Sequence, residues 1–477
     1  MGVVRSGDRA SGANRIRAEF GERVAFPAAA RVGTRHVYAM GALAALLFGY
    51  DNGIIGAAIL FIPRDLPFSP ALEGVVVSAA AGGAMVGALG SGPAADRHGR
   101  QWVLLAAGVV FTFGALGAGA AGSVPVLVLF RFILGLGIGI ASVLVPLYLA
   151  EMAPAQDRGV ITSLNQYMII VGTVLSSAIG YGLGFLGSWR WMFWIGVFPA
   201  LVLTVGMIAV PDTPRSLVRR GHAEQGRAVL MGLRGDAARA EGEFAELMAL
   251  ERQQRDTPTR GRLSARWVRR LLVLGGLLAI FQQITGIGAM AYIPTVLAGF
   301  GMSTRTALLF GFLNGLLNIL TIALIVRAKV VDRRGRKPVL LAGLVGMSAS
   351  LFALGAAALI LPVQSRALFV IAMAAFVVFT NTFSATWGPV LWVVLAEIFP
   401  LATRGVAMAI ATLFNWLTQV LVSLTFPPFT ALAGAGMVFL AYAATGVVIF
   451  PIVWWMVPET RQRSLESLEA AFCTGAH

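Results

Sequence analysis

Charge is scarce in this chain of 477 residues. Asp, Glu, Lys and Arg together make up 12% of it, whereas a soluble domain usually carries about 25% charged residues. Apolar and aromatic residues make up 57%, and the mean hydropathy is +0.80. So few charged groups cannot cover the surface of a globule of this size, which excludes a soluble enzyme and a disordered chain. We therefore expect an all-α integral membrane protein.

Cysteine is almost absent, and so are the motifs of enzymatic chemistry. Cys473 is the single cysteine, so an internal disulfide and a secreted disulfide scaffold are excluded. No metal-ligand cluster, nucleotide-binding loop or nucleophile–base pair is evident. The GLGIG run at 135–139 lies inside an apolar stretch, where glycines serve helix packing rather than phosphate binding. We expect no enzyme activity, no metal and no cofactor.

Long apolar runs are abundant. A helix needs about 20 apolar residues to cross the hydrocarbon core of a bilayer, and the chain contains twelve such stretches. We place these spans at 36–62, 71–94, 101–122, 124–150, 160–186, 190–210, 268–299, 304–328, 338–361, 366–395, 404–428 and 434–457.

Basic residues are distributed unevenly between the loops, and the net charge is +15. In a soluble protein this charge would suggest nucleic acid, but here it reports orientation, and we expect no nucleic acid partner. If both termini and every second loop share one side, that side holds 32 Lys and Arg residues. The opposite side holds four: Arg64, Arg190, Arg305 and Arg366. This bias predicts a multi-pass protein of the cytoplasmic membrane with both termini in the cytoplasm.

The polar segments divide the chain into five parts. These are an arm at 1–35, a first six-helix half at 36–210, a helical linker at 211–267, a second six-helix half at 268–457 and a tail at 458–477. No short apolar region with a small-residue cleavage site precedes the first span, so we expect that span to be an uncleaved anchor.

Three short motifs recur in order, about 240 residues apart. DRHGR at 96–100 recurs as DRRGR at 332–336, EMAPAQDRG at 151–159 as EIFPLATRG at 397–405, and PDT at 211–213 as PET at 458–460. Each pair holds the same place relative to its spans. Such a pattern predicts two halves in parallel repeat, related by an axis along the membrane normal, with a substrate path between them.

The repeated motifs place acids and arginines at the cytoplasmic ends of helices. Carboxylates and guanidiniums can form bidentate pairs there, and such pairs would hold the cytoplasmic end shut and break when it opens. The alternative is that they are only topology anchors and helix caps. The candidate gate residues are Asp96, Arg100, Glu151, Arg158, Asp332, Arg336, Glu397 and Arg404.

Two charges lie well within spans, away from the span ends. Asp51 is midway along the first span and Arg131 is inside the fourth. A carboxylate at mid-helix costs about 2.5–3.5 kcal/mol on insertion scales, so Asp51 should face the interior and pair with Arg131. The pair is either static packing or a proton site, in which protonation of Asp51 releases Arg131 and lets the halves rock.

Polar amides form a second group of intramembrane residues. Gln282 and Gln283 lie in the seventh span, Asn165 and Gln166 in the fifth, and Asn415 in the eleventh, with Trp392 and Trp416 at similar depth. A neutral polyol needs several hydrogen-bonding groups and a flat apolar ring, and this set has no basic residue to attract an organic anion. A single buried amide is more often a contact between helices, worth about 0.6 kcal/mol. The cluster as a whole favours a sugar site.

Glycine and proline mark expected interruptions in two spans and an expected flexible point in a third. Thr285-Gly286-Ile287-Gly288 should interrupt the seventh span, and Gly49 with Gly53 the corresponding first span. Breaks in corresponding spans point to a binding site. Gly388-Pro389 should make the tenth span flexible.

Motifs along 36–470 are together specific for one family. They are GYDNGIIG at 49–56, GPAADRHGR at 92–100, RFILGLGIG at 131–139, PLYLAEMAPAQDRG at 146–159, PDTPRSL at 211–217, QQITGIG at 282–288, DRRGRKP at 332–338, WGPVLWVVLAEIFPLATRG at 387–405 and PETRQRSLESLE at 458–469. In these residues the chain resembles the sugar porter family of the major facilitator superfamily, and in particular its bacterial proton/sugar symporters.

The resemblance implies roles for individual residues. It makes Asp51, with Arg131, the proton-coupling site, which animal facilitators usually lack. Gly288 departs from the family, where Asn is usual, and either Asn314 or Asn318 could be the sugar contact of the eighth span. The implied sugar-site residues are Phe48, Gln166, Gln282, Gln283, Gly288, Tyr292, Asn314, Gly388, Trp392, Asn415 and Trp416.

The sequence therefore predicts a monomeric transporter in the lipid bilayer that moves a hexose or pentose with a proton by alternating access. Two alternatives stay open: an uncoupled facilitator, and a transporter of another polyol such as myo-inositol. A sugar sensor is remote, because the tail after Pro458 is short.

Overall fold

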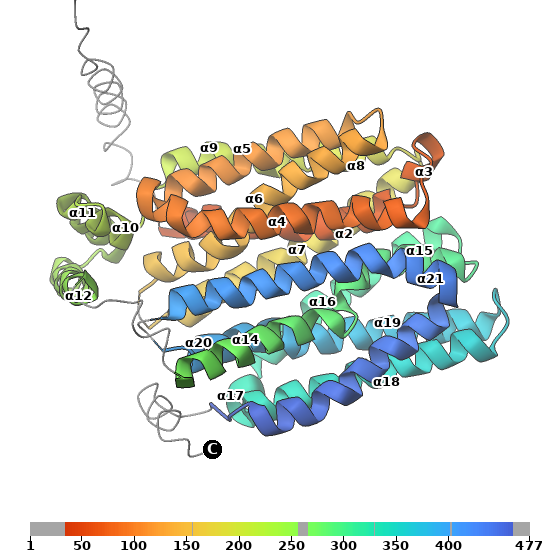
Figure 1. Cartoon of the computed structure of the whole chain (residues 1–477). Helices are drawn as coiled ribbons and strands as arrows, with labels where there is room; N and C mark the ends of the chain where they lie inside the picture. The colour runs from red at the N-terminus through yellow and green to blue at the C-terminus, as the bar shows by residue number, and fades with distance from the viewer. Residues whose placement is uncertain (1–33, 155, 256–265, 329, 401–402, 461–477) are drawn as a thin grey trace, which may run out of the picture.

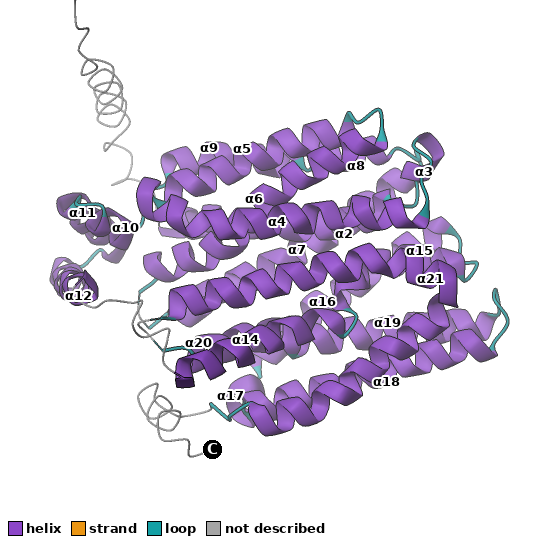
Figure 2. Ribbon diagram, in the orientation of Figure 1, coloured by secondary structure: helices purple, strands orange, loops and turns teal. Residues whose placement is uncertain are grey.

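The computed structural model describes residues 34–154, 156–255, 266–328, 330–400 and 403–460. Helices and loops make up this described part of the chain, and no strand occurs in it (Figure 2). Most of the predicted arm, 1–33, and of the predicted tail, 461–477, lies outside the described residues.

The first half contains six spans and one short connecting helix. Local signals set the helix ends: Ser69 accepts a hydrogen bond from the N–H of Leu72 where α4 starts, and Gly99, with φ +98°, separates α4 from α5. The helices are α2 (Thr34–Ala58), α3 (Ile62–Asp65), α4 (Pro70–His98), α5 (Arg100–Gly119), α6 (Val124–Met152), α7 (Arg158–Gly184), α8 (Trp189–Ile195) and α9 (Val197–Ala209).

The linker and the second half are also built from helices whose ends are set by local signals. The linker forms α10 (Pro214–Arg219), α11 (Ala223–Arg234) and α12 (Ala237–Arg255). The second half comprises α14 (Arg266–Ile284), the 3₁₀ helix η1 (Ile287–Tyr292), α15 (Ile293–Gly299), α16 (Thr304–Arg327), α17 (Val330–Arg334), α18 (Arg336–Ile360), α19 (Arg366–Ala385), α20 (Trp387–Ile398) and α21 (Arg404–Met456).

These helices form twelve membrane crossings. Among the described residues, eleven helical stretches are long and apolar enough to cross a bilayer, and the last of them, α21, has 53 residues. At about 1.5 Å per residue such a helix would be more than twice the thickness of the hydrocarbon core. Gly434, with φ +79°, divides α21 into two crossings, which gives the twelve spans that the sequence predicts.

The expected interruption of the seventh span is present, and an interruption also lies next to the predicted flexible point of the tenth span. The seventh span is interrupted at Gly286, with φ +104°, between α14 and η1. The tenth is interrupted at Thr386, with φ −127° and ψ −88°, just before Gly388-Pro389. The expected break in the first span is wrong, because α2 runs continuously through Gly49 and Gly53.

The glycines of α2 have a different use. A Cβ atom on Gly49 would overlap the carbonyl oxygen of Ile169, and one on Gly53 would overlap the hydroxyl of Ser176. Both partners belong to α7, against which α2 packs. These glycines therefore let two helix backbones approach closely, a common use of small residues in membrane helices.

The two halves lie side by side, and the linker sits at one end of them (Figure 1). We call this the linker end, and the opposite end, where α3 and α15 lie, the α3 end. The halves touch where α4 packs on α21, α7 on α16, and α2 on η1 and α15. Near the α3 end the backbones almost meet, since a Cβ on Gly74 would overlap the carbonyl of Leu424 and one on Gly56 that of Ala291.

Candidate functional site

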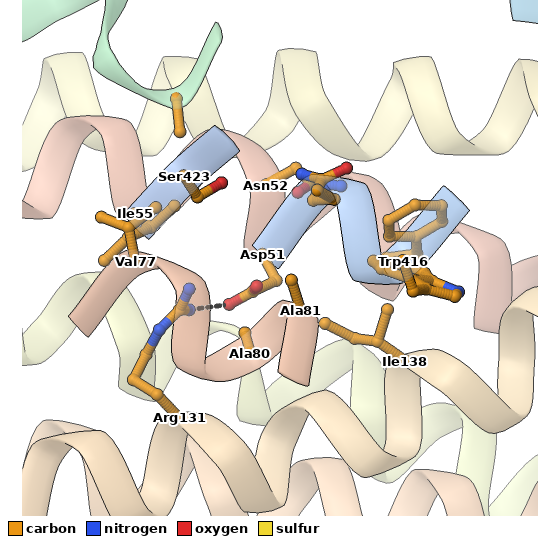
Figure 3. A pocket seen from close by; sticks show the side chains of 13 residues that line it. Asp51, Asn52, Ile55, Val77, Ala80, Ala81, Arg131, Ile138, Trp416 and Ser423 are labelled. Atoms are coloured by element: carbon orange, nitrogen blue, oxygen red, sulfur yellow. Dashed lines mark hydrogen bonds and ion pairs between the residues drawn. The ribbon is translucent and has the colours of Figure 1, made fainter. Parts of the chain in front are cut away.

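An ion pair lies in the interior of the first half. Asp51 of α2 and Arg131 of α6 are 3% and 1% exposed, and Arg131 donates a hydrogen bond from Nη1 to Asp51 Oδ1 (Figure 3). Arg131 also donates from Nε to the carbonyl of Val76 at 3.5 Å. Removing one partner of such a buried pair leaves an uncompensated charge, at a cost of about 3–5 kcal/mol.

A small cavity adjoins this pair and is shared by the two halves. Its volume is about 20 Å³, enough for one water molecule. Asp51 and Asn52 line it from α2, whereas Trp416, Gln419 and Ser423 line it from α21 (Figure 3). Asp51 therefore lies at the boundary along which the halves would move.

Two aromatic rings meet across the same boundary. Phe48 of α2 and Trp416 of α21 have their ring centroids 5.5 Å apart at an interplanar angle of 52°. Both rings line the cavity beside Asp51. The structure thus places these two predicted sugar-site aromatics next to the predicted proton-coupling residue.

The three buried amides of the second half form one hydrogen-bonded cluster. Asn415 Nδ2 donates to Gln282 Oε1 at 2.8 Å, and Gln283 Nε2 donates to Asn415 Oδ1 at 3.1 Å. Gln282 Nε2 donates to the carbonyl of Trp387 at 2.9 Å. Gln283 Oε1 is buried and accepts no hydrogen bond from the described residues. This acceptor therefore has its hydrogen-bonding capacity unused in this conformation.

Gly288 and Tyr292 of η1 lie beside the amide cluster. A Cβ on Gly288 would lie 3.4 Å from Gln283 Oε1 and 2.9 Å from Val422 Cγ1. The Tyr292 hydroxyl donates to the carbonyl of Ser423 at 2.7 Å, and its ring stacks on Phe426 with centroids 5.0 Å apart. Tyr292 therefore joins η1 to α21, and its hydroxyl proton is already engaged.

The other predicted sugar-site residues are more dispersed. Asn314 of α16 faces α19, where Nδ2 donates to Thr380 at 3.0 Å and Oδ1 accepts from Asn381 at 3.2 Å. The Asn314 amide thus joins two helices of the second half. The other candidate, Asn318, has its Oδ1 atom buried without a partner among the described residues. The remaining three are half-buried Gln166 on α7, and buried Gly388 and half-buried Trp392 on α20.

A charged network holds the first half together at the linker end. Arg100 Nε of α5 lies 3.2 Å from Glu151 Oε2 of α6, and the Thr213 hydroxyl donates to Glu151 Oε2 at 2.5 Å. Asp212 Oδ1 accepts the backbone N–H groups of Arg100 and Gln101 at 3.0 and 3.3 Å. A carboxylate at a helix N-terminus is stabilised by these N–H groups and by the helix dipole.

The second half repeats this network. Arg336 Nη2 of α18 donates to Glu397 Oε1 of α20 at 3.0 Å, and the Thr460 hydroxyl donates to Glu397 Oε2 at 2.5 Å. Glu459 accepts the backbone N–H groups of Arg336 and Lys337 at 3.0 and 3.1 Å. The internal repeat of the sequence thus corresponds to a repeated set of contacts.

The predicted gate set omitted four members of these networks. Asp212, Thr213, Glu459 and Thr460 belong to the repeated PDT and PET motifs, and that repetition was the signal that could have identified them.

The remaining gate candidates differ in their contacts. Asp96 accepts from Arg219 of α10 at 2.8 Å, and Arg404 donates to the carbonyl of Phe399 at 3.2 Å. The side chains of Arg158 and Asp332 lie outside the described part of the structure.

Comparison with known proteins places this arrangement among transporters. A family model described as "Sugar (and other) transporter" matches residues 37–472. A D-xylose transporter of Levilactobacillus brevis is 38% identical over 92% of this chain and 96% of its own. The glucose transporter GlcP of Staphylococcus epidermidis is 37% identical over 91% and 96%. The major myo-inositol transporter IolT of Bacillus subtilis is 36% identical over 90% and 92%.

Solved structures agree with these relatives. The xylose transporter XylE from E. coli in an inward-open conformation superposes with a TM-score of 0.79, at 31% identity, over 92% of this chain and 99% of that one. The proton:xylose symporter XylE bound to 6-bromo-6-deoxy-D-glucose, of the major facilitator superfamily, gives a TM-score of 0.76 at 32% identity over 92% and 99%.

Proposed function

Because the chain belongs to the sugar (and other) transporter family and has the major facilitator fold, we propose that it moves a neutral sugar across the cell membrane by proton-coupled alternating access. The chain is a membrane-spanning transporter rather than an enzyme, as its relatives are. The observation that carries the proton coupling is the buried Asp51–Arg131 pair at the boundary between the halves.

The proposed proton carrier is Asp51. While its carboxylate is charged, it neutralises Arg131, and the pair ties α2 to α6. A proton that arrives through the adjoining cavity neutralises Asp51 and removes the attraction. Arg131 then needs another acceptor, because a buried unpaired guanidinium is costly. Protonation thus changes which arrangement of the helices is favoured, which is the requirement for coupling a proton to a conformational change.

The proposed substrate is an uncharged polyol. The cluster of Gln282, Gln283 and Asn415 offers amide donors and acceptors without a formal charge, and Gln283 Oε1 is ready to accept from a hydroxyl. Phe48 and Trp416 supply flat apolar faces for the C–H groups of a sugar ring. None of these five residues carries a charge, and Arg131, which lines the cavity beside the two rings, is neutralised by Asp51. This arrangement favours an uncharged cargo over an organic anion.

The proposed conformation of this structure is closed at the α3 end. The close backbone contacts of Gly56 and Gly74 with the second half lie near that end. We place the linker end in the cytoplasm, because the loops on that side carry 32 of the 37 basic residues. Both termini then lie in the cytoplasm, and the closed α3 end faces outward.

A polyol other than a pyranose is the second candidate substrate, and Gly288 favours it. An asparagine at this position would add an amide beside Gln283 Oε1, and glycine leaves that place without one. The relative named as a myo-inositol transporter has a similar degree of identity to this chain as those named for xylose and glucose.

Uptake into proteoliposomes tests the proposal. The substrates are labelled glucose, galactose, xylose, arabinose and myo-inositol, each with and without an inward proton gradient. We expect one of them to accumulate above equilibrium and a protonophore to collapse that accumulation. Equilibration without accumulation would make the protein a facilitator, and the absence of uptake of all five would refute the sugar assignment.

A further inference from the structure

A second cavity lies near the α3 end, away from the candidate sugar site. Its volume is about 190 Å³. Both halves contribute to its wall: Phe61 and Arg64 come from the segment around α3, and Leu308 comes from α16. The remaining lining residues are Tyr181, Gly184, Phe185, Thr304 and Arg305.

Two arginines, one from each half, face this cavity. The guanidinium carbon of Arg64 lies 5.0 Å from the centroid of the Phe61 ring, and that of Arg305 lies 4.5 Å from the centroid of Phe185. Neither arginine forms an ion pair within the part of the chain that the structure describes, whereas Arg190 on the same side pairs with Asp65. Two of the four basic residues on this side thus share one cavity without a counter-ion.

The start of α16 adds to the positive potential. Ser303 caps this helix of 24 residues by accepting the N–H of Thr306. The N–H groups at the start of a helix have no partner within the helix, and the helix dipole favours an anion beside them. Thr304 and Arg305 belong to this first turn and line the cavity. The cavity therefore combines two guanidiniums with a helix N-terminus.

We propose that this cavity binds the phosphate group of an anionic phospholipid, which bridges Arg64 of the first half and Arg305 of the second. Guanidiniums bind phosphate oxygens through charge-assisted, bidentate hydrogen bonds. One phosphate between the two arginines removes their mutual repulsion and supplies the missing counter-ion.

The surroundings favour a lipid over free phosphate. Phe185 lines the cavity and is 59% exposed, and the next residue, Leu186, is 74% exposed. An apolar rim beside two cations matches a molecule that carries acyl chains below an anionic headgroup. Inorganic phosphate would use the guanidiniums but would leave this rim uncovered.

Such a lipid acts on the conformation of the protein. Arg64 and Arg305 can share one phosphate only while the halves are together at the α3 end. A ligand that binds one of two conformations more tightly shifts the population toward it. The bound lipid therefore favours the closed α3 end, whatever the cargo of the central site is.

Native mass spectrometry of the full-length protein tests the proposal. The probes are phosphatidylglycerol and phosphatidylcholine with the same acyl chains, and inorganic phosphate alone. We expect phosphatidylglycerol to bind in preference to phosphatidylcholine. In the R64Q/R305Q variant its affinity at this site should fall by at least about tenfold, because two charge-assisted contacts are lost.

Arg366→Gln is the matched control, because Arg366 is exposed on the same side and does not line the cavity. It should retain the lipid as the wild-type protein does. The single variant R305Q, with its melting temperature measured, separates loss of the site from loss of the fold. Equal retention by R64Q/R305Q and wild type, or equal loss in R366Q, would overturn the site, and displacement by inorganic phosphate would overturn the lipid as its occupant.

Discussion

At the scale of single residues, Asp51 is the proposed link between proton binding and the movement of the two halves. It is buried against Arg131 in the first half, and it lines the cavity to which α21 of the second half contributes Trp416. The sequence predicted this pair from the free-energy cost of burying a charge in the membrane alone, because a carboxylate and a guanidinium within spans each need the other as a partner. It could not predict that the cavity beside them is shared by both halves.

Asp51→Asn should separate binding from coupling. The amide has nearly the shape of the carboxylate but cannot carry the charge that responds to a proton. We expect sugar to equilibrate across proteoliposomes of this variant without accumulating against a gradient. Glu73→Gln, a neutralised acid at the start of α4 that does not line the cavity, should still accumulate sugar. Gradient-driven accumulation by Asp51→Asn would exclude Asp51 as the coupling residue.

Gly288 should control which polyol is preferred. In Gly288→Asn, the new Cβ would lie 2.9 Å from Val422 Cγ1, and overpacking of this kind costs about 1–3 kcal/mol. Gly288→Asn combined with Val422→Ala should relieve the clash and place a new amide beside Gln283.

One additional hydrogen bond, worth about 0.5–1.5 kcal/mol, should change the order of affinities in a panel of sugars measured by calorimetry. The single Val422→Ala variant is the control and should keep the original order. An unchanged order in the double variant would show that Gly288 does not contact the cargo.

At the scale of helices, the sequence predicted the positions of the helices correctly. It was less reliable in predicting the structural role of the glycines within them. The apolar runs gave all twelve crossings, because length and hydropathy determine them directly. Gly286 breaks a helix, whereas Gly49 and Gly53 lie within one and bring α2 close to α7. Local sequence contains no information about the distance to a neighbouring backbone, so the two uses cannot be distinguished from it.

The same limitation applies to the charged motifs. Their repetition indicated that they matter, but the carboxylates that bind the starts of α5 and α18 come from Asp212 and Glu459, which lie 112 and 123 residues from their arginine partners. Such distant pairings are set by the fold and not by spacing within a motif.

Asp212→Ala should lower the thermal stability of the protein. The carboxylate accepts two backbone N–H groups at the start of α5 and pairs with Arg220, and loss of a helix cap of this type costs about 0.5–2 kcal/mol. We expect a lower melting temperature in detergent, with a smaller decrease for Asp212→Asn, whose amide oxygen still accepts. Glu224→Ala, at an exposed acid of α11, is the control. An equal decrease in both alanine variants would argue against the cap.

At the scale of the whole molecule, the backbones of the two halves come closest at small residues near the α3 end, at Gly56 and Gly74. The backbone of α4 meets that of α21 at Gly74 because the glycine lacks a side chain. Any larger residue there meets main chain, which cannot rotate away. In the proposed alternating-access cycle this contact forms and separates once per turnover.

Gly74→Leu should keep the α3 end apart and slow transport by at least about tenfold, since closing against a fixed overlap costs more than about 1.4 kcal/mol. Spin labels on Cys residues introduced at Leu186 and Val363, both exposed near that end, with Cys473 replaced by serine, should report a longer distance. Gly90→Leu, where no atom lies within 4 Å of the new Cβ, should change neither the rate nor the distance. A normal rate in Gly74→Leu would mean that the contact is not part of the cycle.

The duplicated networks at the linker end have a consequence for the continuity of the chain. Asp212 binds the segment that follows the first half to the start of α5 in that half. Glu459 binds the segment that follows the second half to the start of α18. Neither of these two contacts crosses from one half to the other. A polypeptide divided between α12 and α14 would leave each of these two contacts within a single fragment, so two co-expressed fragments should assemble into a working transporter. The covalent connection between α12 and α14 would then serve to keep the two halves together and would not itself be needed for transport.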